Sequence, residues 1–172
     1  MKTFIKNIPE RKLIISLFVI SLFIRLFYGF YFYSINGTSL FVDDWVYIDF
    51  AKSMLTQGVF VGDISSMTPT RAGVAPFYPF VIFLSFKIFG IKYFPLIILN
   101  AVVSASLTGV VYYSGKLLFS KSIGLISALW TLFYINSIRW VPTLLKENLI
   151  HFLFALLILI ILYLLFSDKS IN

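Results

Sequence analysis

The sequence predicts an all-α protein that crosses a membrane several times. Hydrophobic residues make up 60% of the 172 residues and charged residues only 12%. The mean hydropathy of +0.96 is higher than a soluble domain usually shows. Because a helix rises 1.5 Å per residue and the hydrocarbon core is roughly 30 Å thick, an apolar run of about 20 residues can span it. The predicted spans are 13–34, 93–119, 122–139 and 146–166, the third being short for a span.

The charges are distributed asymmetrically along the chain. The net charge is +7, and basic residues gather before the first span, between the second and third, and after the fourth, whereas four of the seven acidic residues fall between the first two spans. This asymmetry follows the positive-inside rule. It predicts a multi-pass protein of the cell (inner) membrane, with segments 1–12 and 167–172 in the cytoplasm and segment 35–92 outside. It argues against nucleic-acid binding, and the absence of cysteine excludes disulfides and thiolate metal sites.

The first span is predicted to be a retained anchor. Segment 13–34 is longer than the apolar region of a signal peptide, and no small-x-small cleavage motif follows it. An arginine, Arg25, lies past its middle, where a charge costs about 2.5–3.5 kcal/mol on insertion scales. We therefore expect Arg25 to face the helix bundle and to pair with a carboxylate or a phosphate, or else to extend outward to the membrane surface.

The exterior segment 35–92 is predicted to hold two helices. An amphipathic helix covers 43–57 and ends at Gly58. Residues 59–75 are predicted to be irregular, because glycine and proline interrupt them. An apolar helix covers 76–89, which is too short to cross and is typical of interfacial or re-entrant pieces. A five-span alternative counts this helix, but it moves two lysines of the next connection outside, against the charge rule.

Two adjacent carboxylates begin the amphipathic helix. At 100° per residue, Asp43 and Asp44 project from the apolar face on either side of Tyr47, whereas Asp49 lies on the opposite, water-facing side. Carboxylates turned toward a membrane or a bundle are functional-site candidates. The alternative is helix capping, since aspartate is a favoured N-cap and the helix dipole stabilises acids there. The pattern alone leaves both interpretations open.

Other charged residues have similarly open interpretations. Arg71 could bind a phosphate with two parallel hydrogen bonds, or contact lipid headgroups as an anchor. Glu147 lies four residues before His151, so both occupy one face at the start of the fourth span, where an ion-paired helix start is the alternative. Asn100 and its polar neighbours in the second span are expected to serve helix packing.

The order of these features resembles the amino-terminal part of the C-type integral-membrane glycosyltransferases. The branch it is most similar to contains the bacterial protein O-mannosyltransferases and aminoarabinose-transferase-like proteins. Those proteins typically carry Asp-Glu followed by tyrosine after the first span, and here Asp44 replaces the glutamate. The residues that carry the resemblance are Arg25, Asp43, Asp44, Tyr47, Ala51, Leu55, Gly58, Arg71, the loosened Pro76-Phe77-Tyr78-Pro79 stretch, and Glu147.

The resemblance implies a transfer of a hexose or pentose from a polyprenyl-phosphate donor to a hydroxyl acceptor on the exterior face. Asp43, with Asp44, would orient or deprotonate the acceptor. Arg71, helped by Arg25 or Lys92, would bind the departing lipid phosphate, while Tyr47 and Glu147 would support the site. The helix 76–89 would form part of a groove for the lipid carrier. A divalent cation is an open alternative, with Asp43, Asp44 and Glu147 as its ligands.

Family members of this kind have about a dozen spans, so the resemblance covers less than half of a typical member. We therefore expect a fragment, a truncated frame, or a piece that needs a partner such as a missing carboxy-terminal half or a larger membrane complex. Two other classes of function remain open. One is a non-catalytic remnant or assembly subunit. The other is a transporter fragment for a lipid-linked sugar, for which a polar path through the bundle would be expected.

Overall fold

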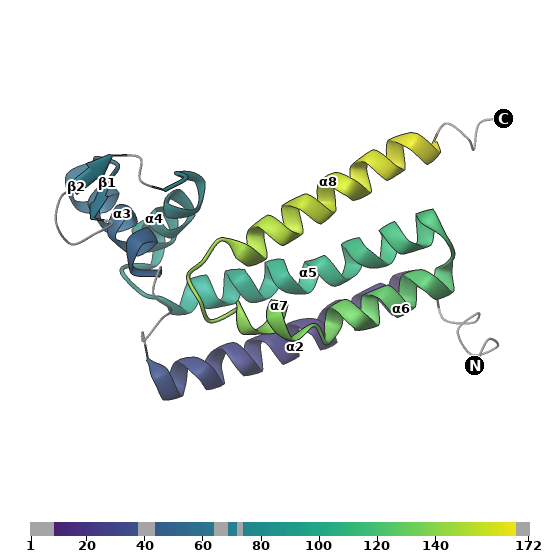
Figure 1. Ribbon diagram of the computed structural model, residues 1–172. Coiled ribbons are helices and arrows are strands. Elements are labelled where there is room, and N and C mark those ends of the chain that lie inside the picture. The colour runs from purple at the N-terminus through teal and green to yellow at the C-terminus, as the bar shows by residue number, and fades with distance from the viewer. Residues whose placement is uncertain (1–8, 38–43, 64–68, 72–73, 168–172) are drawn as a thin grey trace.

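The computed structural model describes residues 9–37, 44–63, 69–71 and 74–167 (Figure 1). Helices account for most of them, and the only strands in this part of the chain form one short antiparallel pair. The elements, in chain order, are α2 (Glu10–Asn36), α3 (Asp44–Gln57), β1 (Val61–Asp63), β2 (Pro69–Arg71), α4 (Phe77–Phe89), α5 (Phe94–Leu118), α6 (Lys121–Leu132), α7 (Ile135–Arg139) and α8 (Glu147–Ser167).

Helix α5 lies at the centre of the bundle. It contacts α2, α6 and α8 along its length, and α7 near its start. Figure 1 shows α3, α4 and the two strands gathered at one end of this bundle, where α2 ends and where α5 and α8 begin. The start of α2 and the ends of α5 and α8 lie at the opposite end. We call the first the α3–α4 end and the second the opposite end.

Three helices among the described residues are long and apolar enough to cross a membrane: Glu10–Asn36, Phe94–Leu118 and Glu147–Phe166. They correspond to the predicted spans 13–34, 93–119 and 146–166, so the prediction of a helical multi-pass membrane protein is confirmed. The two shorter predicted helices, 43–57 and 76–89, appear as α3, whose described residues begin at Asp44, and α4, which starts one residue later than predicted. Their exterior placement and the orientation of the termini stay predictions.

The predicted span 122–139 is not a continuous helix. Helix α6 ends at Leu132, and the short α7 begins at Ile135 after a break. The apolar pattern runs through this break, so the local sequence gives no sign of it. Irregular backbone at membrane depth is tolerated only where the protein itself satisfies the freed polar groups. Arg25 does so here, because its guanidinium donates to the last carbonyls of α6, those of Thr131 and Leu132, at 3.2 and 3.3 Å.

Two glycines allow α5 and α6 to pack closely. A Cβ added to Gly124 would lie 2.5 Å from the carbonyl oxygen of Tyr112 and 2.9 Å from the backbone nitrogen of Lys116. A Cβ on Gly115 would lie 3.0 Å from the Cα of Gly124. Both contacts are with backbone, which cannot turn aside as a flexible side chain can. Small residues at such crossings are typical of membrane helices.

Helix α3 buries the face that the sequence predicted. Tyr47, Ile48, Phe50 and Ala51 are all buried, and α3 packs against α4. Residues 59–75 were predicted to be irregular, but 61–63 and 69–71 pair as antiparallel strands. This pair lies against α3, where Gly62 approaches the ring of Phe50 so closely that a Cβ would clash with it. The strands are too short to change the all-α class.

Candidate functional site

Asp44 connects the start of α3 to the loop before α8. Its side chain is fully buried, and its Oδ2 accepts a hydrogen bond from the backbone nitrogen of Leu144 at 3.2 Å. The inward orientation predicted for this carboxylate is confirmed. The contact also joins two segments 100 residues apart in the sequence. The neighbouring carboxylate, Asp43, lies outside the described residues, as does the side chain of Arg71, whose backbone belongs to β2.

Glu147 and Tyr78 share the surroundings of Asp44. Tyr78, from α4, is only 4% exposed. Burial raises the pKa of its hydroxyl well above the usual value, and the nearby carboxylates of Asp44 and Glu147 raise it further, whereas a hydrogen bond with Asn100 lowers it. Two carboxylates from separate elements thus act on one buried phenol. Glu147 Oε2 is itself buried and has no hydrogen-bond partner among the described residues.

Asn100 anchors the same loop from α5. Its Nδ2 donates to the carbonyl oxygens of Thr143 at 2.7 Å and Val141 at 3.3 Å, and the Tyr78 hydroxyl lies 3.5 Å from its amide. The loop between α7 and α8 is therefore held by Asn100 on one side and by Asp44 on the other. This double attachment fixes the position at which α8, and with it Glu147, begins.

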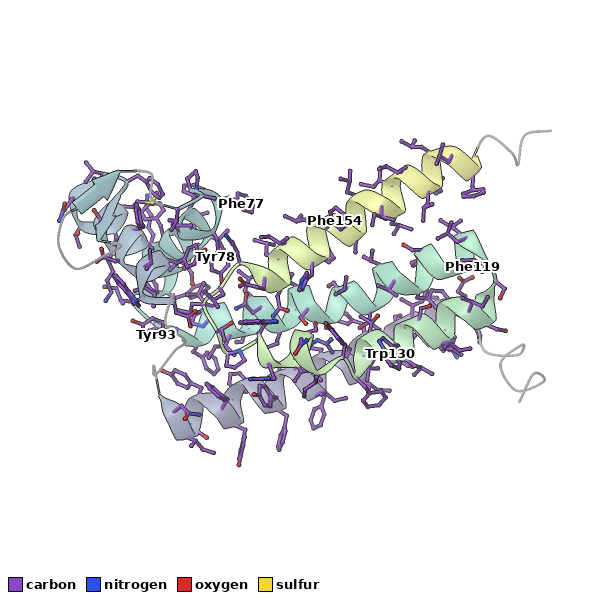
Figure 2. The ribbon with its side chains drawn as sticks, viewed as in Figure 1. Phe77, Tyr78, Tyr93, Phe119, Trp130 and Phe154 are labelled. Carbon is purple, nitrogen blue, oxygen red and sulfur yellow. The ribbon has the colours of Figure 1, made fainter. Side chains whose placement is uncertain are left out.

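Tyr47 supports Tyr78, and a lysine lies over it. The two rings meet edge to face, with centroids 5.7 Å apart and planes at 84°. Lys146 directly precedes α8, and its ammonium lies 6.0 Å from the centroid of the Tyr47 ring. Figure 2 shows Tyr78 near the start of α8 and of α5. The supporting position expected for Tyr47 fits these contacts, while its role in chemistry stays a prediction.

Sequence reasoning did not single out three residues of this region as site members. Tyr78 was noted only as part of the Pro-Phe-Tyr-Pro stretch, and Asn100 was interpreted as a packing residue. Asn148 was passed over, although it is 1% exposed and neither atom of its amide has a hydrogen-bond partner among the described residues. A signal for Asn100 was available, because a polar amide within an apolar span is costly unless it bonds across helices.

Arg25 does not belong to this cluster. It is fully buried in the bundle core, and all five N–H donors of a guanidinium can be assigned to protein acceptors around it. We therefore withdraw Arg25 as a phosphate ligand, because no donor remains for one. Its acceptors are the hydroxyls of Ser21, Ser104 and Ser137 and the carbonyl oxygens of Ser21, Thr131 and Leu132.

An apolar groove lies between α4 and α5, the helices that carry Tyr78 and Asn100. Its volume is about 650 Å³, and its walls are almost entirely apolar. Phe89 and Phe94, which line it, flank the turn that carries the exposed Lys92. The turn therefore brings a cation close to the groove. The other lining residues are Val81, Leu84, Ser85, Pro95, Ile98, Leu99 and Val102.

The comparison with protein families decides the relationship of the chain. The sequence model of the dolichyl-phosphate-mannose-protein mannosyltransferases matches residues 73–172. The chain belongs to this family. The resemblance that the motifs indicated is thereby confirmed at the level of the family, as is a membrane mannosyltransferase-like class of function. Neither a curated protein nor a solved structure matches the chain.

The family match covers only part of the candidate site. Tyr78, Lys92, Asn100 and Glu147 lie within residues 73–172, whereas Asp43, Asp44 and Arg71 precede them. The roles of these earlier residues in a mannosyltransferase-family protein therefore rest on their own motif and on the geometry around Asp44.

The described residues give little support to the predicted divalent-cation site. Within residues 9–37, 44–63, 69–71 and 74–167, no three His, Cys, Asp or Glu side chains are grouped so that they could hold a metal ion. Asp44 already accepts a hydrogen bond from Leu144, and Asp43 lies outside these ranges. A site built from Asp43, Asp44 and Glu147 stays a prediction.

Proposed function

We propose that this chain carries the acceptor-side residues of a membrane glycosyltransferase that takes a sugar from a polyprenyl-phosphate donor and passes it to a hydroxyl acceptor on the exterior face. The observation that carries the proposal is the hydrogen bond that holds the buried Asp44 to Leu144, three residues before Glu147 and in the same core cluster as Tyr78. An apolar groove lies between α4 and α5, the helices that carry Tyr78 and Asn100. Family membership supports sugar transfer, and the groove supports a lipid-borne donor.

The chemistry needs a base and a stabilised leaving group. The acceptor oxygen attacks the anomeric carbon, the bond from that carbon to the phosphate oxygen breaks, and the phosphate keeps the electron pair. A carboxylate receives the acceptor proton. By resemblance this carboxylate is Asp43. Asp44 is suited to fixing the start of α3, because Leu144 already occupies its Oδ2. Glu147 Oε2, buried and unpaired among the described residues, is suited to orienting a hydroxyl.

The leaving phosphate needs positive charge rather than a proton donor. Two of the three residues first considered for this task remain, Arg71 and Lys92. Lys92 is exposed, and the turn that holds it lies between two residues that line the α4–α5 groove. A polyprenyl chain in this groove would place its phosphate close to that turn. We propose this arrangement for the donor.

The proposal is tested by replacing Asp43 with asparagine. The transfer of sugar from a polyprenyl-phosphate donor is measured in membranes that contain the natural protein. Asp43→Asn removes the base and is expected to lower the rate at least about 10²-fold. The matched control is Asp49→Asn, which makes the same change on the opposite face of the predicted helix. An unchanged rate in Asp43→Asn, with equal expression, would remove the catalytic assignment.

The groove is tested separately. Leu84→Trp and Ile98→Trp each add volume to its lining and are expected to raise KM for the lipid-linked donor more than they lower kcat. Leu153→Trp, on the exposed side of α8, is the control. A KM equal to that of the wild type in both groove variants would mean that the lipid binds elsewhere.

A polar stripe along α5 bears on the transport alternative. Asn100, Ser104 and Thr108 are buried and spaced four residues apart, as expected for a polar path. Their side chains, however, are hydrogen-bonded within the bundle: Thr108 to Ser21 at 3.1 Å and Ser104 to Ser137 at 2.7 Å. Groups that satisfy one another in this way serve helix packing. The stripe therefore does not favour transport over transfer.

A further inference from the structure

The opposite end of the bundle holds two cavities that share a wall. The first, of about 500 Å³, lies between α5 and α8 and includes Ile160 and Tyr163 in its apolar lining. The second, of about 360 Å³, lies between α2 and α5, and its lining includes three charged residues, Glu10, Arg11 and Lys116. Tyr113 and Lys116 line both cavities. Two separate spaces therefore extend from one polar position at the end of α5.

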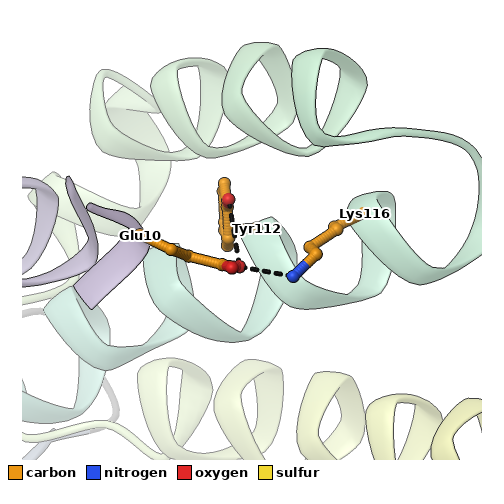
Figure 3. Close-up of polar contacts among 3 residues, drawn as sticks. All are labelled: Glu10, Tyr112 and Lys116. Atoms are coloured by element: carbon orange, nitrogen blue, oxygen red, sulfur yellow. Dashed lines mark hydrogen bonds and ion pairs between the residues drawn. The ribbon is translucent and has the colours of Figure 1, made fainter. Parts of the chain in front are cut away.

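This shared position is positively charged. Figure 3 shows Lys116 joined to Glu10 by a contact of 2.6 Å, with the Tyr112 hydroxyl donating to the same carboxylate oxygen at 3.3 Å. An ammonium has three donors, so two remain on Lys116. Arg11 is exposed and has no hydrogen bond or ion pair with the described residues around it. With Lys12 also exposed on α2, the cations outnumber the one carboxylate.

The surroundings of the first cavity are those of a lipid-facing surface. Tyr163 of α8 is 62% exposed and Ile160 is 49% exposed, and no part of the apolar window of α8 is buried. In a bilayer such a surface is in contact with lipid tails. Aromatic residues and lysines at the ends of the helices are typical of the level at which headgroups lie.

We propose that this end of the protein binds one anionic phospholipid. Its phosphate lies in the second cavity, between Arg11 and Lys116, and an acyl chain lies in the apolar first cavity, on the other side of Tyr113. An anionic headgroup with an apolar chain matches a cationic cavity that adjoins an apolar one. Basic pockets between membrane helices are known binding places for anionic headgroups. The proposal does not depend on the proposed function.

The test measures lipid binding to the purified full chain in detergent by native mass spectrometry. The probes are phosphatidylglycerol and phosphatidylcholine with identical acyl chains. Because each basic residue near an anionic headgroup contributes about fivefold in affinity, the wild type is expected to bind phosphatidylglycerol at least fivefold more tightly. Arg11→Ala is expected to remove about fivefold of this preference. The matched control is Arg139→Ala, which removes the same charge from an exposed position on α7.

A second variant tests the cavities without changing charge. Ile160→Trp adds volume to the lining between α5 and α8 and is expected to weaken both phospholipids alike. Circular dichroism and thermal unfolding verify that each variant is folded. Equal binding of the two phospholipids by the wild type would overturn the proposal, and so would an Arg11→Ala variant that behaves as Arg139→Ala does. Displacement of phosphatidylglycerol by an equal concentration of dodecaprenyl phosphate would assign the position to a single-chain carrier and overturn it as well.

Discussion

Arg25 shows how one buried residue can determine the course of a distant segment. A charged side chain in the first span would be expected to mark a ligand, but this one donates to the last two carbonyl oxygens of α6, of which that of Leu132 faces the break before α7. A charge in a membrane helix normally pairs with groups inside the bundle. The sequence favoured an Arg25 that faces the bundle, but it could not reveal the two carbonyl partners on α6, because these lie more than 100 residues away.

Replacing Arg25 tests this structural role. Arg25→Leu leaves the carbonyl oxygen of Leu132 without its partner, removes a second donor from that of Thr131, and is expected to lower the free energy of unfolding by at least about 2 kcal/mol. Arg25→Lys keeps the charge but has three donors at one point, so an intermediate loss is expected. Thermal unfolding in detergent measures both variants. A Leu variant as stable as the wild type would contradict the assignment.

Tyr78 gives the site a signature at alkaline pH. Its pKa is raised in the folded protein by burial, whereas in the unfolded chain a tyrosine ionises near pH 10. Above that pH the unfolded state has lost a proton that the folded state keeps, so stability falls as pH rises. Below pH 10 this residue contributes no pH dependence.

The comparison of wild type with Tyr78→Phe isolates this effect. Between about pH 10 and 11.5 the free energy of unfolding of the wild type is expected to fall more steeply with pH than that of the variant. The difference in slope is at most that produced by the release of one proton on unfolding. Unfolding midpoints measured at intervals across that range decide the matter. Parallel curves for the two proteins would mean that Tyr78 ionises as easily in the folded state as in the unfolded one.

At the scale of elements, the long helices could be predicted because periodicity and length are local properties of the sequence. Segments 94–118 and 147–167 match their predicted spans to within two residues. The break between α6 and α7 could not be predicted, since the apolar pattern of 122–139 continues through it. The strand pair was also missed, because short strands between glycine and proline residues resemble irregular loops.

The packing of α5 on α6 yields a prediction with its own control. Gly124→Ala places a methyl group against the backbone of Tyr112 and Lys116, so the two helices must separate, at a cost of about 1–3 kcal/mol. Gly109→Ala, in the middle of α5, meets nothing nearer than 3.9 Å and is expected to be neutral or slightly stabilising. Denaturation in detergent compares the two, and an equal effect of both substitutions would contradict this account of the crossing.

At the scale of the whole molecule, the candidate site is assembled from four elements that are far apart in the sequence. Asp44 begins α3, Tyr78 lies in α4, Asn100 in α5, and Glu147 begins α8. The sequence predicted that Asp44 would turn inward and that Glu147 would lie at a helix start. It could not predict that the two would meet around Tyr78, because only the folded loop held by Asn100 brings them together.

The most direct test of this assembly is the rate of sugar transfer by Glu147→Gln, measured with a polyprenyl-phosphate donor in membranes that contain the natural protein. The substitution keeps the shape of the side chain and removes its charge. The account predicts a loss of at least about 10²-fold, with unchanged expression, whereas His151→Gln, one turn further along the exposed side of α8, transfers at the rate of the wild type. A Glu147→Gln protein that transfers sugar as fast as the wild type would contradict the account.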